Sequence, residues 1–180
     1  QLTLGPAISN GFYYDIDFSN SKLKSQNPNL NNTEASNKPS SDKDLKDITK
    51  VMQKVVRNDG AFTHEVVSYN IAKEIFADNK YKLELIEEIN SRGEDITLYT
   101  INFTKGNGEL SGDKFTDLCR GGHCENISEI SEGSFRLDKI AGAYWRGDEK
   151  REQLTRIYGL AFESKEELES YDQQIEEAKK

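Results

Sequence analysis

Alternating apolar and polar positions recur along the chain and predict several β-strands. The first clear case ends at Phe18, where aromatic and aliphatic residues alternate with Asp15 and Asp17. The same kind of pattern predicts five further strands, at Phe62–Val67, Ile96–Ile101, Lys114–Cys119, Ser134–Ile140 and Leu154–Phe162. A tight turn is expected at Gly106-Asn107-Gly108.

Helices are predicted where apolar residues recur every three or four positions behind a capping residue. The first helix begins after Ser41, with Asp44 completing a capping box, and the last begins after Ser164, with Glu167 in the same role. Ser68 caps a shorter helix, and the Glu and Leu content of residues 81–89 favours a helix there. The apolar residues expected on these helix faces are Leu45, Ile48, Val51, Met52 and Val55; Ile71, Ala72, Ile75 and Phe76; and Leu168, Tyr171, Ile175 and Ala178.

Together these elements predict an α+β fold, with a mainly antiparallel sheet and segregated helices. With 180 residues, the chain is expected to form one domain whose last helix, at 164–180, leads toward a further domain. Asn and Ser dominate residues 19–41, which we interpret as a flexible insertion without chemistry. The chain begins with Gln1 rather than Met, so we expect it to be part of a longer protein.

Composition narrows the range of partners and compartments. The net charge of −8 argues against nucleic-acid binding as an independent purpose, because phosphate neutralisation drives most such affinity. No apolar stretch is long enough to span a membrane and no secretory leader is recognisable, so no membrane partner is expected. Two closely spaced cysteines do not form a disulfide framework, which favours a cytoplasmic location, with an organelle as the alternative.

The greatest concentration of reactive side chains lies in the segment FTDLCRGGH, residues 115–123. As catalytic groups, His123 would orient or deprotonate water, Cys119 would be a nucleophile or a pocket wall, and Asp117 would be a base or an orienting group. As a zinc site, Cys119 and His123 lack further ligands, because Cys124 is badly placed and His64 is distant in the sequence. Structural coincidence is the third interpretation, since short motifs often match by chance.

Longer motifs around this segment carry a family resemblance. FTDLCRGGH, followed by GAYWRGD at 142–148 and by LTRIYG at 154–159, resembles the second additional domain of bacterial-type threonyl-tRNA synthetases. The early GPAI and GFYYD elements at 5–8 and 11–15, and the Tyr-Lys-Leu run at 81–83, match further positions of that family. The related domain of alanyl-tRNA synthetases lacks the GAYWRGD run. The resemblance covers nearly the whole chain except the insertion at 19–41.

The resemblance implies proofreading. A synthetase that selects threonine cannot reject serine well by affinity, since a missing methyl group is worth only about 1–3 kcal/mol. The family's domain therefore hydrolyses the ester of seryl-tRNA(Thr) with water as the nucleophile. The implied partners are the serine-carrying acceptor end of tRNA(Thr) and the other domains of the same synthetase, which is expected to be a homodimer. No cofactor is expected in this chain, whereas ATP, Mg and Zn would serve the parent enzyme's catalytic domain, which ligates threonine to tRNA(Thr).

Carried over position by position, the resemblance implies specific roles. His123 would position or activate water with help from Lys82, Asp117 would recognise the seryl group, Cys119 would shape the pocket, and Gly11 would form a wall through its backbone. No residue is expected to bind a metal. The family also has an H-x3-H pair upstream of the GPAI element, which this sequence does not contain, and a proline where Gly122 stands.

Two other functions remain open, a non-catalytic module that docks the tRNA acceptor end and a metal-dependent hydrolase or lyase of small molecules. Trp145 is expected in the core rather than as a stacking platform for RNA, and Tyr13 and Tyr14 are expected to pack rather than bind ligand. His64 is expected at the surface or a sheet edge. Three arginines remain undecided between tRNA phosphates and surface ion pairs, namely Arg146, Arg151 and Arg156.

Overall fold

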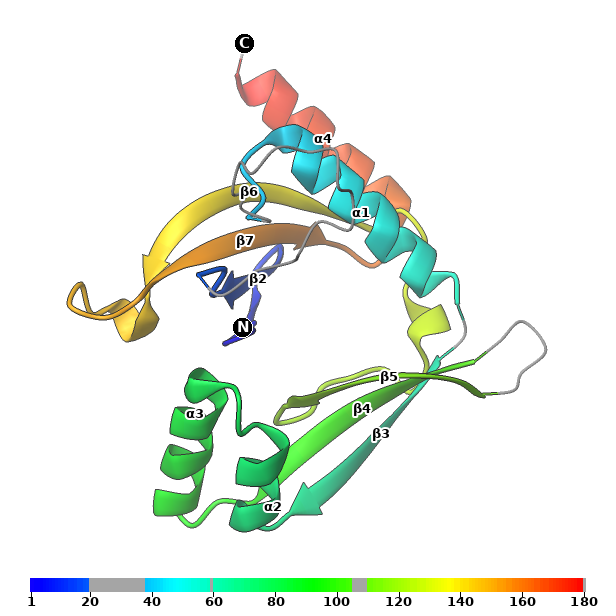
Figure 1. The fold of residues 1–180 in the computed structure, drawn as a ribbon. Coiled ribbons are helices and arrows are strands. Elements are labelled where there is room, and N and C mark those ends of the chain that lie inside the picture. The colour runs from blue at the N-terminus through cyan, green and yellow to red at the C-terminus, as the bar shows by residue number, and fades with distance from the viewer. Residues whose placement is uncertain (20–37, 59, 105–109, 180) are drawn as a thin grey trace, which may run out of the picture.

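The computed structural model describes residues 1–19, 38–58, 60–104 and 110–179, and it contains two antiparallel sheets with helices beside each (Figure 1). The first sheet has the order β1-β2-β7-β6, formed by Ala7–Ile8, Gly11–Ile16, Gln153–Ala161 and Phe135–Tyr144. The second has the order β3-β4-β5, formed by Gly60–Val67, Ile96–Thr104 and Leu110–Leu118. The predicted α+β class is confirmed. The division into two sheets was not predicted, because alternation along a strand fixes its two faces but not its neighbours.

Each sheet carries its own pair of helices. Helices α1 (Asp42–Val56) and α4 (Lys165–Ala178) lie on the outer face of the first sheet, whereas α2 (Tyr69–Ile75) and α3 (Lys80–Ser91) lie beside the second (Figure 1). Two short 3-10 turns, η1 (Ile127–Glu129) and η2 (Trp145–Gly147), complete the described elements. We refer below to the first half (β1, β2, β6, β7, α1, α4) and the second half (β3–β5, α2, α3).

The helix starts agree with the sequence, with one correction. Ser41 and Asp44 form the predicted capping box, and the Ser68 hydroxyl accepts the N–H of Ile71. At α4, the Ser164 hydroxyl accepts the N–H of Glu167 as predicted. The Glu167 carboxylate, however, accepts the backbone N–H of Glu163 instead of that of Ser164, so the reciprocal bond of the capping box is displaced by one residue.

The apolar faces of the helices are buried less completely than predicted. Leu45, Ala72 and Leu168 are buried, and most of the other predicted positions are partly buried. The predicted core positions that are instead exposed are Val51, Ile71, Ile75, Ile175 and Ala178. Helices α1 and α4 lie at the surface beside the first sheet and α2 lies beside the second (Figure 1), so only the innermost line of each apolar stripe is enclosed.

One apolar cluster connects the two halves of the molecule. Tyr81 of α3, Trp145 of η2 and Leu154 of β7 pack together, and each is about 1% exposed. Trp145 is therefore a core residue, as predicted. The N-terminal segment also joins the halves, because Thr3 donates its N–H and hydroxyl to the carbonyl of Asp15 while the Asn79 side chain donates to the carbonyl of Leu2.

Some predictions fall outside the described residues. These are the turn at 106–108 and most of the insertion at 19–41. Within the described ranges, no helix combines the length and apolar character needed to cross a bilayer.

Candidate active site

A cavity of about 960 Å³ lies between the two halves. Phe115 and Asp117 of β5, and Cys119 directly after it, line the cavity together with alternate residues of β4, because side chains two apart on a strand share a face. Lys82 of α3 and His123 of the loop after β5 line it as well, as do Thr3, Leu4, Gly5, Pro6 and Tyr14 from the first half. Four of the five predicted site residues therefore meet in one cavity.

Gly11 is the predicted site residue that the structure does not bring to this cavity. It starts β2, where it pairs with Leu160 of β7 at a φ of 153°. A Cβ at this position would overlap the carbonyl of Gly159, so close packing of β2 on β7 requires glycine there. Gly5, in the preceding segment, lines the cavity instead.

Lys82 and Asp117 form a buried ion pair. The Lys82 side chain is only 4% exposed, and its Nζ lies 2.7 Å from Oδ1 of Asp117. The Asn79 side chain accepts the N–H groups of Tyr81 and Lys82, which fixes the start of α3 and thus the origin of the lysine side chain. A buried ammonium needs such a partner, because an unpaired charge in this environment would be strongly unfavourable.

Asp117 also contacts the other half of the molecule. Its Oδ1 accepts the N–H of Leu118 at 2.8 Å, and its Oδ2 accepts the hydroxyl of Tyr14 at 2.8 Å. Burial and the charge of Asp117 raise the pKa of Tyr14, so this hydroxyl keeps its proton and remains a donor. The sequence prediction that Tyr14 only packs missed this contact, which joins residues 103 positions apart and leaves no local signal.

His123 is held by two aromatic rings and a thiol. Its ring lies 4.8 Å from that of Phe62 and 4.5 Å from that of Tyr99, centre to centre. Its Nε2 is 3.1 Å from Sγ of Cys119, and that thiol donates to the carbonyl of Gly121. Either atom can be the donor in the Nε2–Sγ contact, and in both tautomers of a neutral imidazole one ring nitrogen is an acceptor.

The turn between Cys119 and His123 depends on its two glycines. Gly121 has a φ of 112° and Gly122 a φ of 83°. Proline fixes φ near about −65°, so the turn of this chain has a conformation that a proline at position 122 does not allow.

The other residues that the sequence pointed to contact neighbouring side chains. Arg146 and Arg151 pair with Glu84, and Arg156 pairs with Asp15, which favours the ion-pair interpretation of all three. His64 is exposed within the edge strand β3 and stacks on Tyr99, as the edge prediction expected. Burial and the nearby Glu129 raise the pKa of Cys124. Within the described ranges, no three His, Cys, Asp or Glu side chains lie together as a metal site would require.

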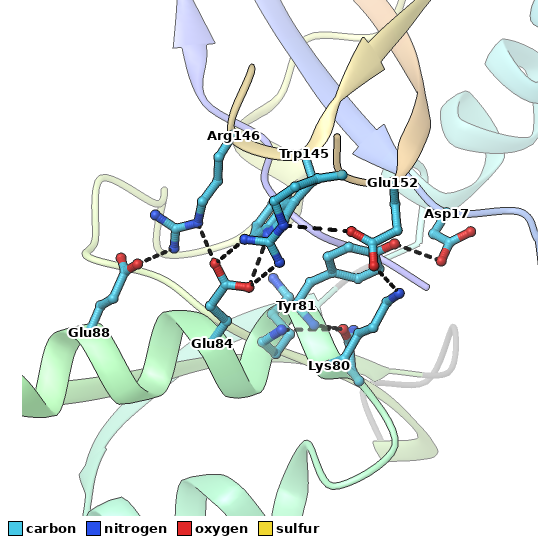
Figure 2. A network of polar contacts seen from close by, with 11 residues as sticks. Asp17, Lys80, Tyr81, Glu84, Glu88, Trp145, Arg146 and Glu152 are labelled. Atoms are coloured by element: carbon cyan, nitrogen blue, oxygen red, sulfur yellow. Dashed lines mark hydrogen bonds and ion pairs between the residues drawn. The ribbon is translucent and has the colours of Figure 1, made fainter. Parts of the chain in front are cut away.

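Figure 2 shows the contacts on another face of α3, where Glu84 and Glu88 meet Trp145 and Arg146 from η2. The hydrogen bonds from the Arg151 guanidinium lower the pKa of Glu84 most, and with Trp145 and Arg146 they bring it to about 2, against burial, which raises it. The sequence did not single out Glu84 or Glu88, which resemble ordinary solvated helix residues by pattern alone.

Comparison with known proteins gives one family and many relatives. Residues 96–158 match the family described as the threonyl and alanyl tRNA synthetase second additional domain. Over its whole length the chain is 41% identical to the threonine–tRNA ligase of Thermotoga neapolitana, 39% identical to that of Rhizobium johnstonii and 36% identical to that of Borrelia garinii subsp. bavariensis. The chain spans 23% of the length of the first two relatives and 26% of the third. The family match includes Asp117, Cys119 and His123.

Proposed function

Because the chain carries the second additional domain of threonyl- and alanyl-tRNA synthetases and matches threonine–tRNA ligases along its whole length, we propose that it is a proofreading module that hydrolyses seryl-tRNA(Thr). One observation carries this proposal. The Lys82–Asp117–Tyr14 group and the Cys119–His123 pair face the same cavity, so a charged recognition group lies beside a potential base.

The proposed reaction uses water and the side chains at hand. The Asp117 carboxylate accepts the α-ammonium group of the seryl moiety, and the Lys82 ammonium stabilises the oxyanion that forms at the ester carbonyl. The water oxygen bonds to the carbonyl carbon while one water proton passes to the imidazole of His123. That proton then goes to the terminal ribose oxygen as the ester C–O bond breaks, which releases serine and uncharged tRNA.

On the basis of the relatives, the proposal extends to the rest of the parent protein. Since these are threonine–tRNA ligases, we place the chain beside a catalytic domain that uses ATP, Mg and Zn, in a cytoplasmic and dimeric enzyme. The tRNA acceptor end would then reach the cavity while other domains hold the tRNA. This division of labour fits the acidic charge of the chain, which is −8.

Deacylation of seryl-tRNA(Thr) and threonyl-tRNA(Thr) tests the proposal directly. We would compare this chain with a version extended upstream by the H-x3-H segment of a threonine–tRNA ligase. Selective cleavage of the seryl ester by the extended chain supports the proposal. Binding of tRNA without cleavage by either protein would favour the docking module, and zinc-dependent turnover of a small ester would favour the metal hydrolase.

The two histidines of the chain provide a matched pair of variants. Loss of the base in H123A is expected to lower the seryl cleavage rate by about 100-fold or more. H64A removes the other imidazole, which stacks on Tyr99 without lining the cavity, and is expected to cleave normally. Equal rates for H123A and the unaltered protein would contradict the role of His123.

A further inference from the structure

Two faces of helix α3 make contacts with the rest of the protein, and each face contacts a different half of the molecule. Lys82 and Ile86 face the second half, where Lys82 meets Asp117 and Ile86 packs in the core with Ala72. Positions 81, 84, 85 and 88 lie on another face, since residues three and four apart are neighbours on a helix. Through that second face α3 contacts η2 and β7 at Trp145 and Leu154 and donates the Tyr81 hydroxyl to Asp17.

The turn η2 contacts this second face through a network of ion pairs (Figure 2). Glu84 accepts the indole N–H of Trp145 at 3.1 Å and two guanidinium contacts from Arg151 at 2.9 and 2.7 Å. Arg146 bridges one helical turn of α3, with its Nε 2.7 Å from Glu84 and its Nη2 2.5 Å from Glu88. The GAYWRGD motif thus lies on the helix that carries Lys82.

Arg146 has a backbone conformation that its side-chain contacts must stabilise. Its φ is 56° and its ψ is 21°, and within the described ranges it is the only residue other than glycine with a positive φ. Glycine would adopt this conformation without strain, and the next residue is a glycine with a φ of 72°. An arginine here is explained by what its guanidinium does, namely join Glu84 to Glu88.

We propose that Arg146 is a positioning residue for Lys82. Through its ion pairs with Glu84 and Glu88 it holds α3 in the position from which the lysine ammonium contacts Asp117. This inference rests on the proposed function of the cavity and extends it to the GAYWRGD turn. Tyr14 belongs to the half that carries η2, and Lys82 belongs to the other half. The ion pairs of Arg146 with Glu84 and Glu88, which we call the clamp, therefore determine how Lys82 and Tyr14 meet at Asp117 across the cavity.

The informative variant is R146G in the extended chain. It removes the guanidinium and relieves the backbone strain together, so the lost ion pairs are partly offset and the protein is expected to fold. Misplacement of Lys82 is expected to lower kcat for seryl-tRNA(Thr) by about 10- to 100-fold while KM changes by less than about twofold. R146K, which restores one cation beside the two carboxylates, is expected to recover part of kcat.

The matched control is R57G, which breaks the Arg57–Glu132 ion pair, an exposed pair that does not involve α3. R57G is expected to keep the kcat and KM of the unaltered chain. An unchanged kcat in R146G overturns the inference, as does an equal loss of kcat in R57G. A rise in KM alone would overturn it too, because it would make Arg146 a substrate contact.

A second readout does not depend on turnover. Reductive methylation of lysines, followed by mass spectrometry of the present chain, reports how accessible the Lys82 ammonium is. Lys82 is expected to react far more slowly than Lys165, whose side chain is 59% exposed, and R146G is expected to speed Lys82 about threefold or more without changing Lys165. Equal protection of Lys82 in both proteins overturns the inference. If the unaltered extended chain cleaves no seryl ester, the proposed function fails and this labelling result alone decides the positioning role.

Discussion

Replacing Arg156 by methionine tests whether the arginine of the LTRIYG run is structural. Arg156 of β7 lies opposite Asp15 of β2 in the first sheet, and its guanidinium meets the carboxylate at two points, 2.7 and 2.8 Å. The same guanidinium lies 4.0 Å from the centre of the Tyr13 ring. R156M keeps the length and apolar stem of the side chain but leaves the carboxylate of Asp15, a residue only 5% exposed, without its cation.

The expected loss of stability follows from this burial. Removing one partner of a buried ion pair costs about 3–5 kcal/mol, and we expect about 3 kcal/mol because the Arg156 side chain is 26% exposed and admits some water. The double variant D15N/R156M should be more stable than the sum of the two single losses predicts, by about 1–3 kcal/mol, because the residues are in direct contact.

Urea unfolding followed by circular dichroism at 25 °C measures these differences through the transition midpoint and its slope. The control is R57M, which breaks the exposed Arg57–Glu132 pair and should cost about 0–1 kcal/mol. A loss below about 1 kcal/mol in R156M, or strict additivity in the double variant, would refute the reasoning from burial. Arg156 would then be free for another role, such as the tRNA contact that the sequence left open.

Three further predictions concern the clamp, the turn between Cys119 and His123, and the first sheet. The folded-state pKa of Glu84 is about 2, below its ordinary 4.5, so its contribution to stability is present above pH 4.5 and is lost as the pH falls toward 2. The stability gap between the unaltered protein and E84Q in urea should therefore narrow across that window, and a constant gap would contradict the assignment. G122P should lower the midpoint of thermal unfolding, with a loss above about 1 kcal/mol, because proline cannot adopt the φ of 83° at that position; a rise would show that the turn rearranges. G159A should cost about 1–3 kcal/mol because its methyl group would overlap the Phe12 ring, and the second change F12L should restore part of the loss in the same unfolding assay.

Local patterns predicted the elements well because their causes are local. Ser41 and Ser68 cap helices with hydrogen bonds that span three residues, and the predicted strand Lys114–Cys119 corresponds to the second half of β5. The resemblance to synthetase domains then added Lys82, which composition alone would have left as a surface residue. The cavity confirms that these side chains lie together, while their catalytic roles stay predictions.

The features that the sequence did not predict depend on contacts between distant segments. The hydroxyl of Tyr14 reaches Asp117 across the cavity, and Glu84 meets Trp145 and Arg151 from the other half of the molecule. Neither pair has a spacing that periodicity can detect. The placement of Gly11 was missed for a related reason, since a glycine required by strand packing looks the same in sequence as one that lines a pocket.

The aromatic surroundings of His123 give the site its own magnetic signature. Phe62, His123, Tyr99 and His64 make successive ring contacts, with centre-to-centre distances of 4.8, 4.5 and 5.3 Å. Ring currents from both Phe62 and Tyr99 act on the imidazole protons of His123, whereas the ring contact of His64 among the described residues is with Tyr99. Because the chain contains only these two histidines, their proton resonances should be separable without assignment of the full spectrum. The integrity of the candidate site can then be followed in solution before any tRNA is added.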